Sequence, residues 1–183
     1  MSFIVETGTF RCVTTEYFAS RLTIPVFSIE NNRRNYGFAM ARLKRFKCVR
    51  IILGDSVQVL ENLFKERTLP EGPGFFYLDV HWGMHLPLKE EVSLIFDRHR
   101  SSIVMIDDFE IPDDPGYDFD DYGENGSLTL SYLSGTIDRL GLVGFFPNCP
   151  SSEETGKRRG MIVITTAIFA ERLRSIDTLR EII

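Results

Sequence analysis

The chain opens on the stretch FIVETGTFRCVT, residues 3–14, and this stretch decides the fold. Its first three residues are aromatic or β-branched, which is typical of a buried strand. The strand ends near Glu6, and Gly8 lies in the turn that follows, where a glycine lets the backbone approach a ligand closely. Residues 14–21 then predict a short helix. A buried strand, a glycine turn and a helix predict the first repeat of an α/β fold.

The rest of the chain continues this alternation of strands and helices. Further strands are predicted at residues 25–29, 49–53, 75–78 and 103–106, and further helices at 33–46, 55–64, 88–98 and 128–140. Asn31 or Asn32 is the predicted N-cap of the helix over 33–46, and Asp55, paired with Gln58, is that of the helix ending at Phe64. Strands predicted at 142–146 and 161–165 lie too close together for a helical crossover, so we expect a hairpin, followed by a helix over 167–183. The pattern predicts a doubly wound Rossmann-like α/β sheet, mostly parallel, with one antiparallel strand from the C-terminal hairpin. We expect one domain spanning residues 1–183.

The composition indicates a globular protein of ordinary make-up. Apolar residues make up 43% of the 183 residues and charged residues 26%, which excludes collagen-like, disordered and disulfide-scaffold chains. The three cysteines are too few and too scattered for a disulfide framework or a zinc site, which favours a reducing, cytoplasmic setting. No apolar run approaches the length of a membrane span, and no signal peptide is visible.

Acidic residues are concentrated in one short segment. Nine of the 26 acidic residues fall within residues 107–124, and no Lys or Arg occurs between Arg100 and Arg139. Aromatic residues and prolines alternate with these acids, which favours an ordered flap over an acceptor site rather than a solvating tail. A basic run over residues 33–50 could form a nucleic-acid patch. Because apolar residues interleave with it at helical spacing, we interpret it as the solvated face of a helix.

Each of the five predicted parallel strands ends at or near an acidic residue. In a doubly wound sheet ligands bind outside the carboxyl ends of the strands, so these acids mark the expected site. Glu30 follows Gly8 by about 20 residues, the spacing at which an acid can hold ribose hydroxyls. The turn lacks both the dinucleotide and the P-loop pattern, so Gly8 alone could be an ordinary turn glycine and Glu30 alone a surface acid. Together they favour a nucleoside ligand.

Several of these segments resemble motifs of class I S-adenosylmethionine (SAM)-dependent methyltransferases, in particular the catechol-type O-methyltransferases that act on small molecules. The resemblance runs in order through the segments ETGTFRCVT at 6–14, SIE at 28–30, YGFA at 36–39, GDS at 54–56, YLDVHW at 77–82 and MIDDF at 105–109. It implies that the chain binds SAM through Glu6, Gly8, Thr9, Thr14, Glu30, Asp55, Ser56 and Asp79.

The ends of the fourth and fifth predicted strands suggest a metal site. Asp79, Asp107 and Asp108 would converge if these strands are adjacent, and close carboxylates need a proton or a cation. The chemistry of the donors favours Mg²⁺ or Ca²⁺, although strand-end acids can also simply cap a loop. In the family that the chain resembles, such acids hold a divalent metal that activates a substrate hydroxyl. The catalytic lysine of that family has no counterpart here, so His81, with Asp79 beside it, is the candidate base.

The sequence leaves several alternatives open. Cys12 replaces the second glycine of the resembled motif, and the chain lacks the helices that usually precede the first strand. Both departures allow for a degenerate protein that binds SAM, a nucleoside or a protein partner without catalysis. Within the same fold and metal site, methylation of nitrogen or of another acceptor is an alternative to methylation of a hydroxyl. A nicotinamide-dependent dehydrogenase is a weaker alternative. We expect a small-molecule acceptor, no nucleic acid and no membrane as partners, and the 15 phenylalanines allow for a homodimer.

Overall fold

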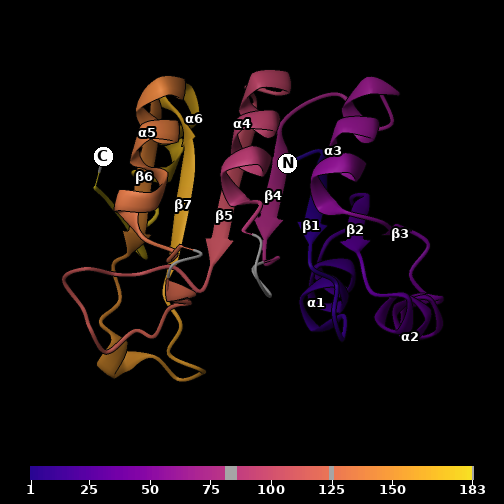
Figure 1. The fold of residues 1–183 in the computed structure, drawn as a ribbon, viewed down its shortest axis with the longest axis horizontal. Coiled ribbons are helices and arrows are strands. Elements are labelled where there is room, and N and C mark those ends of the chain that lie inside the picture. The colour runs from indigo at the N-terminus through magenta and orange to yellow at the C-terminus, as the bar shows by residue number, and fades with distance from the viewer. Residues whose placement is uncertain (81–85, 124–125, 183) are drawn as a thin grey trace. The chain divides into compact units, whose positions relative to one another are not determined.

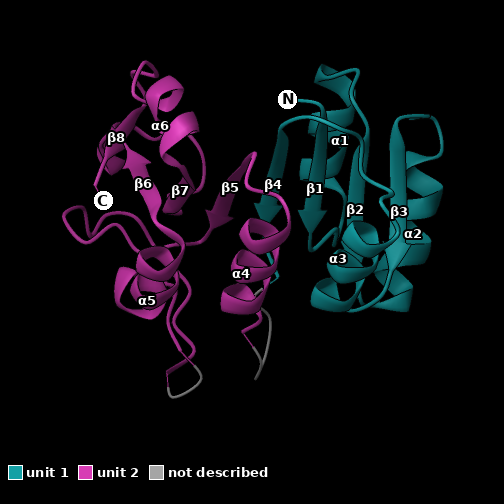
Figure 2. Cartoon of the chain, turned by 90° about the horizontal axis from the view of Figure 1, so that it is seen from above, with its two compact units in different colours: residues 1–80 teal, residues 81–183 magenta. Residues whose placement is uncertain are grey.

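The structure, a computed structural model, describes residues 1–80, 86–123 and 126–182. It comprises two compact units, Met1–Val80 and His81–Ile183, coloured separately in Figure 2. Strands and helices alternate through both units, as predicted. The prediction for His81 falls outside the described residues.

The first unit is built on parallel strands. These are β1 (Phe3–Thr7), β2 (Val26–Glu30), β3 (Val49–Leu53) and β4 (Gly74–Leu78), in the spatial order β3-β2-β1-β4. Every residue of β1 and β2 is buried, as expected for strands that have neighbours on both sides and helices on both faces. Glu6 pairs in register with Ser28 on one side and Tyr77 on the other. The carboxyl ends of β1, β2 and β4 therefore lie side by side.

Three helices connect these strands: α1 (Val13–Arg21), α2 (Arg33–Leu43) and α3 (Ser56–Lys65). Figures 1 and 2 show α1 and α3 on opposite faces of the strands, the arrangement of a doubly wound sheet. Two predicted N-caps are present: the Asn32 side chain accepts from Arg34 N at 2.9 Å, and Asp55 accepts from Gln58 N at 3.0 Å. Helix α2 ends three residues earlier than predicted, where Phe46 N donates to the Leu43 carbonyl in a turn at 2.9 Å.

The second unit carries the antiparallel part of the fold. Its elements are α4 (Leu88–Arg98), β5 (Ser102–Asp107), α5 (Leu130–Leu140), β6 (Leu142–Pro147), the short 3₁₀ helix η2 (Ser151–Glu153), β7 (Met161–Thr166), α6 (Ala167–Leu173) and β8 (Leu179–Glu181). The strands lie in the order β5-β7-β6-β8, and β7 is antiparallel to both β5 and β6. The predicted C-terminal hairpin is therefore β6–β7. Helices α4 and α5 pack against each other, and α6 packs on β6 and β7.

The predicted helix over residues 167–183 is wrong beyond Leu173. Helix α6 ends there, and the chain returns as β8, which pairs antiparallel with β6. The Asn148 side chain donates to the Asp177 carbonyl at 2.9 Å, and the Arg174 guanidinium binds the Glu181 carboxylate. The open edge of β6 thus supplies backbone partners that outweigh the helical tendency of this segment. The fold therefore ends on a second antiparallel strand in addition to β7.

No helix in the described part of the chain combines the length and the apolarity that a membrane span requires.

Candidate functional site

The turn after β1 is held between the two strands that flank β1. Gly8 has a φ of +89°, and a Cβ atom placed on it would lie 2.3 Å from the Asp79 carbonyl oxygen. Its amide donates to the Ile29 carbonyl at 3.0 Å, and the Asp79 amide donates to the Thr7 carbonyl at 3.1 Å. Both the backbone conformation and the close approach require a glycine. The glycine that the sequence singled out is therefore needed by the turn itself.

Glu30 links the end of β2 to this turn. Its side chain is only 5% exposed, and one carboxylate oxygen accepts from Phe10 N at 2.7 Å while the other accepts from Asn32 N at 2.8 Å. A carboxylate offers about four acceptor positions, so each oxygen keeps capacity for a further donor. Gly8 and Glu30, predicted from sequence spacing to act together, are thus joined through the backbone of one turn.

Glu6 lies in a buried network of hydroxyl groups. Its carboxylate accepts from the Thr15 hydroxyl at 2.5 Å and from the Ser28 hydroxyl, and Ser28 also shares a hydrogen bond with the Thr9 hydroxyl at 2.6 Å. Burial raises the pKa of Glu6 to about 7, although the hydrogen bonds from Ser28 and Thr15 oppose the rise. Glu6 and Thr9 are therefore directed at neighbouring side chains inside the unit. Sequence reasoning missed Thr15 and Ser28.

Cys12, which stands where the resembled motif has a glycine, keeps the backbone that a glycine would adopt. Its φ of 64° and ψ of 22° are left-handed, and it forms the N-cap of α1. The side chain is fully buried against Ala39 and Leu43, and burial raises the pKa of its thiol to about 11. The thiol is therefore neutral at physiological pH and serves as a small apolar side chain. Cys12 therefore adopts the left-handed conformation at the start of α1 although it carries a side chain.

The remaining predicted cofactor residues lie at strand ends and helix starts of the first unit. Thr14 is half-buried in the first turn of α1, Asp55 is exposed as the cap of α3, and Asp79 is half-buried directly after β4. The Ser56 hydroxyl is buried, and it has no hydrogen-bond partner among residues 1–80, 86–123 and 126–182. Such a hydroxyl costs free energy unless something else pairs with it, so it can serve a bound ligand.

The predicted metal ligands belong to different units, with Asp79 in the first and Asp107 and Asp108 in the second. Asp107 ends β5, and Asp108 follows it with a left-handed φ of 53°. The Asp108 carboxylate binds the Arg159 guanidinium, and Arg159 also binds Asp120. No group of three or more metal-ligating side chains occurs among the residues that can be described. With an arginine on Asp108, the donor set as it stands does not fit Mg²⁺.

The described part of the acidic segment after β5, up to Gly123, packs through its aromatic and apolar residues within the second unit. Phe109, Ile111 and Tyr117 are buried, and the Tyr117 hydroxyl donates to the Cys149 carbonyl at 3.0 Å. Asp114 accepts from the Ser151 amide at 2.7 Å and from the Ser151 hydroxyl at 2.6 Å. Some of the acids in this loop thus already bind other groups of the second unit. Arg159, which binds two of them, was missed by sequence reasoning.

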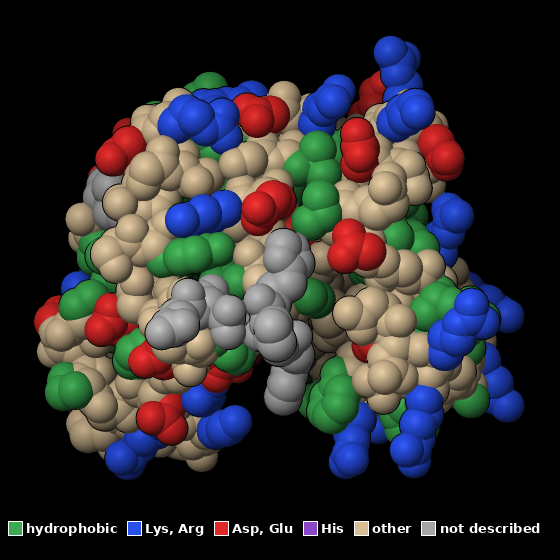
Figure 3. Space-filling model, in the orientation of Figure 1, with side chains coloured by type: hydrophobic (Ala, Val, Ile, Leu, Met, Phe, Trp, Pro, Cys, Tyr) green, Lys and Arg blue, Asp and Glu red, His purple; other side chains and the backbone are tan. Residues whose placement is uncertain are grey.

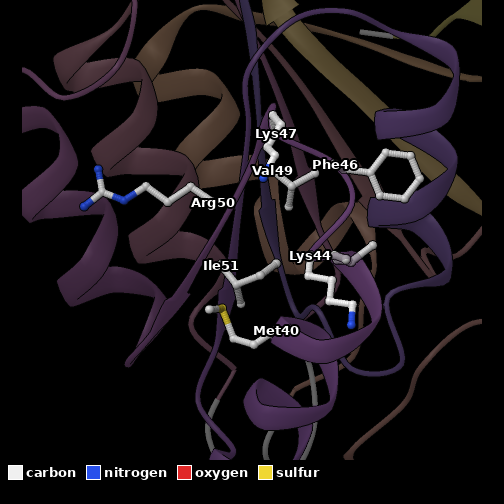
Figure 4. Close-up of a pocket in the computed structure, with 8 residues that line it drawn as sticks. Met40, Lys44, Phe46, Lys47, Val49, Arg50 and Ile51 are labelled. Carbon is white, nitrogen blue, oxygen red and sulfur yellow. The ribbon is translucent and has the colours of Figure 1, made fainter.

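A separate hollow lies beside β3 in the first unit. Figure 3 shows Lys and Arg side chains gathered around α2, and Figure 4 shows the hollow of about 430 Å³ between α2 and β3. Met40 and Ile51 form part of its apolar lining, Lys44 and Lys47 also line it, and the Arg50 side chain extends away from the other labelled residues (Figure 4). Its lining includes none of the predicted cofactor residues, so the candidate cofactor site rests on the turn after β1.

The basic run beside this hollow is partly neutralised. Arg42 and Arg45 both bind Glu16 at 2.5 Å, which joins α2 to α1. Part of the run therefore serves contacts between helices.

No protein-family model and no curated protein sequence matches the chain, but its backbone matches solved structures. The match to a Staphylococcus aureus protein assigned as a caffeoyl-CoA O-methyltransferase has a TM-score of 0.63 at 19% identity. It covers 91% of this chain and 76% of that chain. The fold is that of the class I SAM-dependent methyltransferases.

Two further solved structures share this methyltransferase fold. An O-methyltransferase from Bacillus cereus in complex with S-adenosylhomocysteine (SAH) matches with a TM-score of 0.58 at 14% identity, over 90% of this chain and 74% of that chain. A precorrin-6y C5,15-methyltransferase from Geobacter metallireducens matches with a TM-score of 0.57 at 12% identity, over 90% and 79% of the two chains. The named reactions of these proteins differ, so the methyltransferase fold leaves the acceptor open.

Proposed function

We propose that the chain is a SAM-dependent methyltransferase that methylates a hydroxyl group of a small molecule. The observation that carries the proposal is the turn after β1, in which Gly8 approaches the β4 end and Glu30 anchors the backbone at Phe10. The solved O-methyltransferase structures with the same fold support the choice of acceptor atom.

Several residues of the first unit have a defined part in this proposal. The remaining acceptor positions of Glu30 would take the ribose hydroxyls, and the backbone of the turn at Gly8 would lie against the methionine part of the cofactor. The Ser56 hydroxyl, which has no hydrogen-bond partner among the described residues, and Asp55 would lie near the adenine. Glu6 would act indirectly, since its carboxylate positions α1 through Thr15 and β2 through Ser28. When bound, SAM supplies an electrophilic methyl group.

The acceptor half of the proposal rests on fewer residues. His81, as a base, would take the proton from the acceptor hydroxyl, and the ordered acidic loop would cover the acceptor and disfavour anionic molecules. The proposed mechanism uses no divalent metal, because Arg159 already binds Asp108. Positioning of the acceptor oxygen would then provide most of the rate.

Calorimetric titration with SAM and with SAH tests the cofactor assignment. We expect binding in the micromolar range for the native chain and a loss of about tenfold or more for Glu30→Gln, since an amide cannot replace both accepting oxygens. Glu61→Gln, an exposed change on α3, is the matched control and should bind normally. Absence of binding at millimolar concentration, or binding of a nicotinamide dinucleotide in its place, would overturn the assignment.

The transfer step needs a separate experiment. Incubation with SAM carrying a labelled methyl group and a panel of small hydroxylated molecules should label an acceptor. If SAM binds and no acceptor of any kind is labelled, the degenerate binding protein becomes the better account.

A further inference from the structure

A single arginine joins the end of β5 to the middle of the acidic loop. Arg159 donates from Nε to Asp108 Oδ1 and from Nη2 to Asp120 Oδ1. The side chains of Arg159 and Asp108 are each 17% exposed, and that of Asp120 is 24% exposed. At this burial the three charges interact more strongly than surface pairs do. The ion pairs of Arg159 are therefore stronger than ordinary ion pairs on an exposed surface.

The backbone holds these three residues in place from several sides. The Phe109 amide donates to the Gly160 carbonyl at 2.9 Å, and the Asp120 amide donates to the Asp108 carbonyl at 2.9 Å. On the other side of Arg159, the Asp118 carbonyl accepts from Gly160 N at 2.9 Å. A Cβ atom on Gly160 would lie 2.1 Å from the Phe109 carbonyl oxygen, so the two backbone segments lie too close together for any residue other than glycine at this position. These backbone hydrogen bonds thus place the Arg159 guanidinium beside Asp108.

The remaining oxygen of Asp120 is also occupied. Tyr122 donates its hydroxyl to Asp120 Oδ2 at 2.5 Å. Burial, followed by this hydrogen bond, raises the pKa of Tyr122, which keeps the proton on the phenol. The carboxylates of Asp108 and then Asp120 raise the pKa of Arg159 despite its burial, which keeps the guanidinium charged. The two donors, Tyr122 and Arg159, therefore both keep the protons that these hydrogen bonds use.

We propose that Arg159 is a built-in cation that takes the place of a divalent metal on Asp108. The guanidinium holds the acidic loop at the carboxyl end of β5, where carboxylates would otherwise call for a bound ion. A divalent cation at Asp108 would have to lie close to a positive charge that already bonds two carboxylates at once. For catalysis, this inference rests on the proposed function. If the chain is a methyltransferase, we expect methyl transfer to continue in the presence of a chelator.

Manganese binding tests this directly, because Mn²⁺ is detected by electron paramagnetic resonance without any activity. The native chain should bind Mn²⁺ no tighter than millimolar, and Asp108→Asn should leave that weak binding unchanged. Arg159→Met should tighten Mn²⁺ binding at least tenfold, and adding Asp108→Asn to that variant should abolish the gain. Arg158→Met, the exposed neighbouring arginine, is the matched control and should behave like the native chain.

Thermal unfolding provides a second readout on the same samples. The melting temperature of the native chain should be equal in EDTA and in Mg²⁺, whereas Arg159→Met should melt lower and be partly rescued by Mn²⁺. Micromolar Mn²⁺ binding by the native chain that Asp108→Asn removes would overturn the inference, and so would an Arg159→Met variant that gains no Mn²⁺ affinity. If Arg159→Met does not fold, the native titration and the native melting comparison decide. SAM affinity, measured separately, shows whether the proposed function fails on its own account.

Discussion

Raising the pH from about 4 to about 8 should lower the free energy of unfolding of the ligand-free protein by about 3 kcal/mol through Glu6 alone. Burial raises the pKa of this carboxyl from 4.5 in the unfolded chain to about 7 in the fold. Below pH 4.5 Glu6 is protonated in both states and its neutral form suits the buried site. Between about pH 4.5 and 7 the unfolded chain ionises this carboxyl while the folded state keeps it protonated, so the stability is lost over this range, and the loss ends above pH 7, where both states are ionised.

Urea unfolding at a series of pH values measures this effect. Glu6→Gln should remove the Glu6 part of the pH dependence, so the difference between the native and variant curves isolates it from other titrating groups. Thr15→Val should make the fall with pH steeper, because the Thr15 hydroxyl stabilises the ionised carboxylate. Parallel curves for the native chain and Glu6→Gln would contradict the raised pKa.

Gly8→Ala should be the most damaging small substitution in the first unit. A Cβ atom at this position lies 2.3 Å from the Asp79 carbonyl oxygen, and the φ of +89° is disfavoured for alanine. Strained backbone alone costs about 1–3 kcal/mol, and the clash adds to it because a backbone carbonyl cannot move aside cheaply. Chemical denaturation should report a loss in unfolding free energy at or above the top of that range.

Gly37→Ala is the matched control for this prediction. Gly37 lies inside α2, and nothing lies within 4 Å of a Cβ atom placed on it. Alanine there should stabilise the protein by about 0.5–1 kcal/mol, since glycine is a poor helix former. SAH affinity should fall for Gly8→Ala and stay unchanged for Gly37→Ala. Equal effects of the two substitutions on stability would show that the turn after β1 tolerates a side chain.

Much of the fold could be predicted from local signals in the sequence. The strands were found because short β-branched and aromatic runs alternate with helical patterns, and the caps Asn32 and Asp55 were found because their side chains act on nearby amides. The C-terminal segment was predicted wrongly as helix, because its strand β8 exists only through pairing with β6. No local signal in residues 179–181 reveals that partner.

Only those site residues that stand out by their type and by their position at a strand end could be predicted. Glu6, Gly8 and Glu30 stand out because they follow buried strands, whereas Thr15 and Ser28 are ordinary residues until the fold brings them to Glu6. Arg159 lies 51 residues from Asp108, and only the antiparallel register of β5 and β7 brings the two together. The sequence could therefore suggest a metal from the acids at the strand ends, but it could not reveal that the Arg159 guanidinium binds Asp108.

A crystal structure of the chain grown with SAH tests the proposed cofactor site. We expect SAH at the carboxyl ends of β1 and β2, with both ribose hydroxyls within hydrogen-bond distance of the Glu30 carboxylate and the homocysteine part against the turn at Gly8. Crystals grown at saturating SAH without the ligand at this turn, or with the ligand bound away from Glu30, would contradict it.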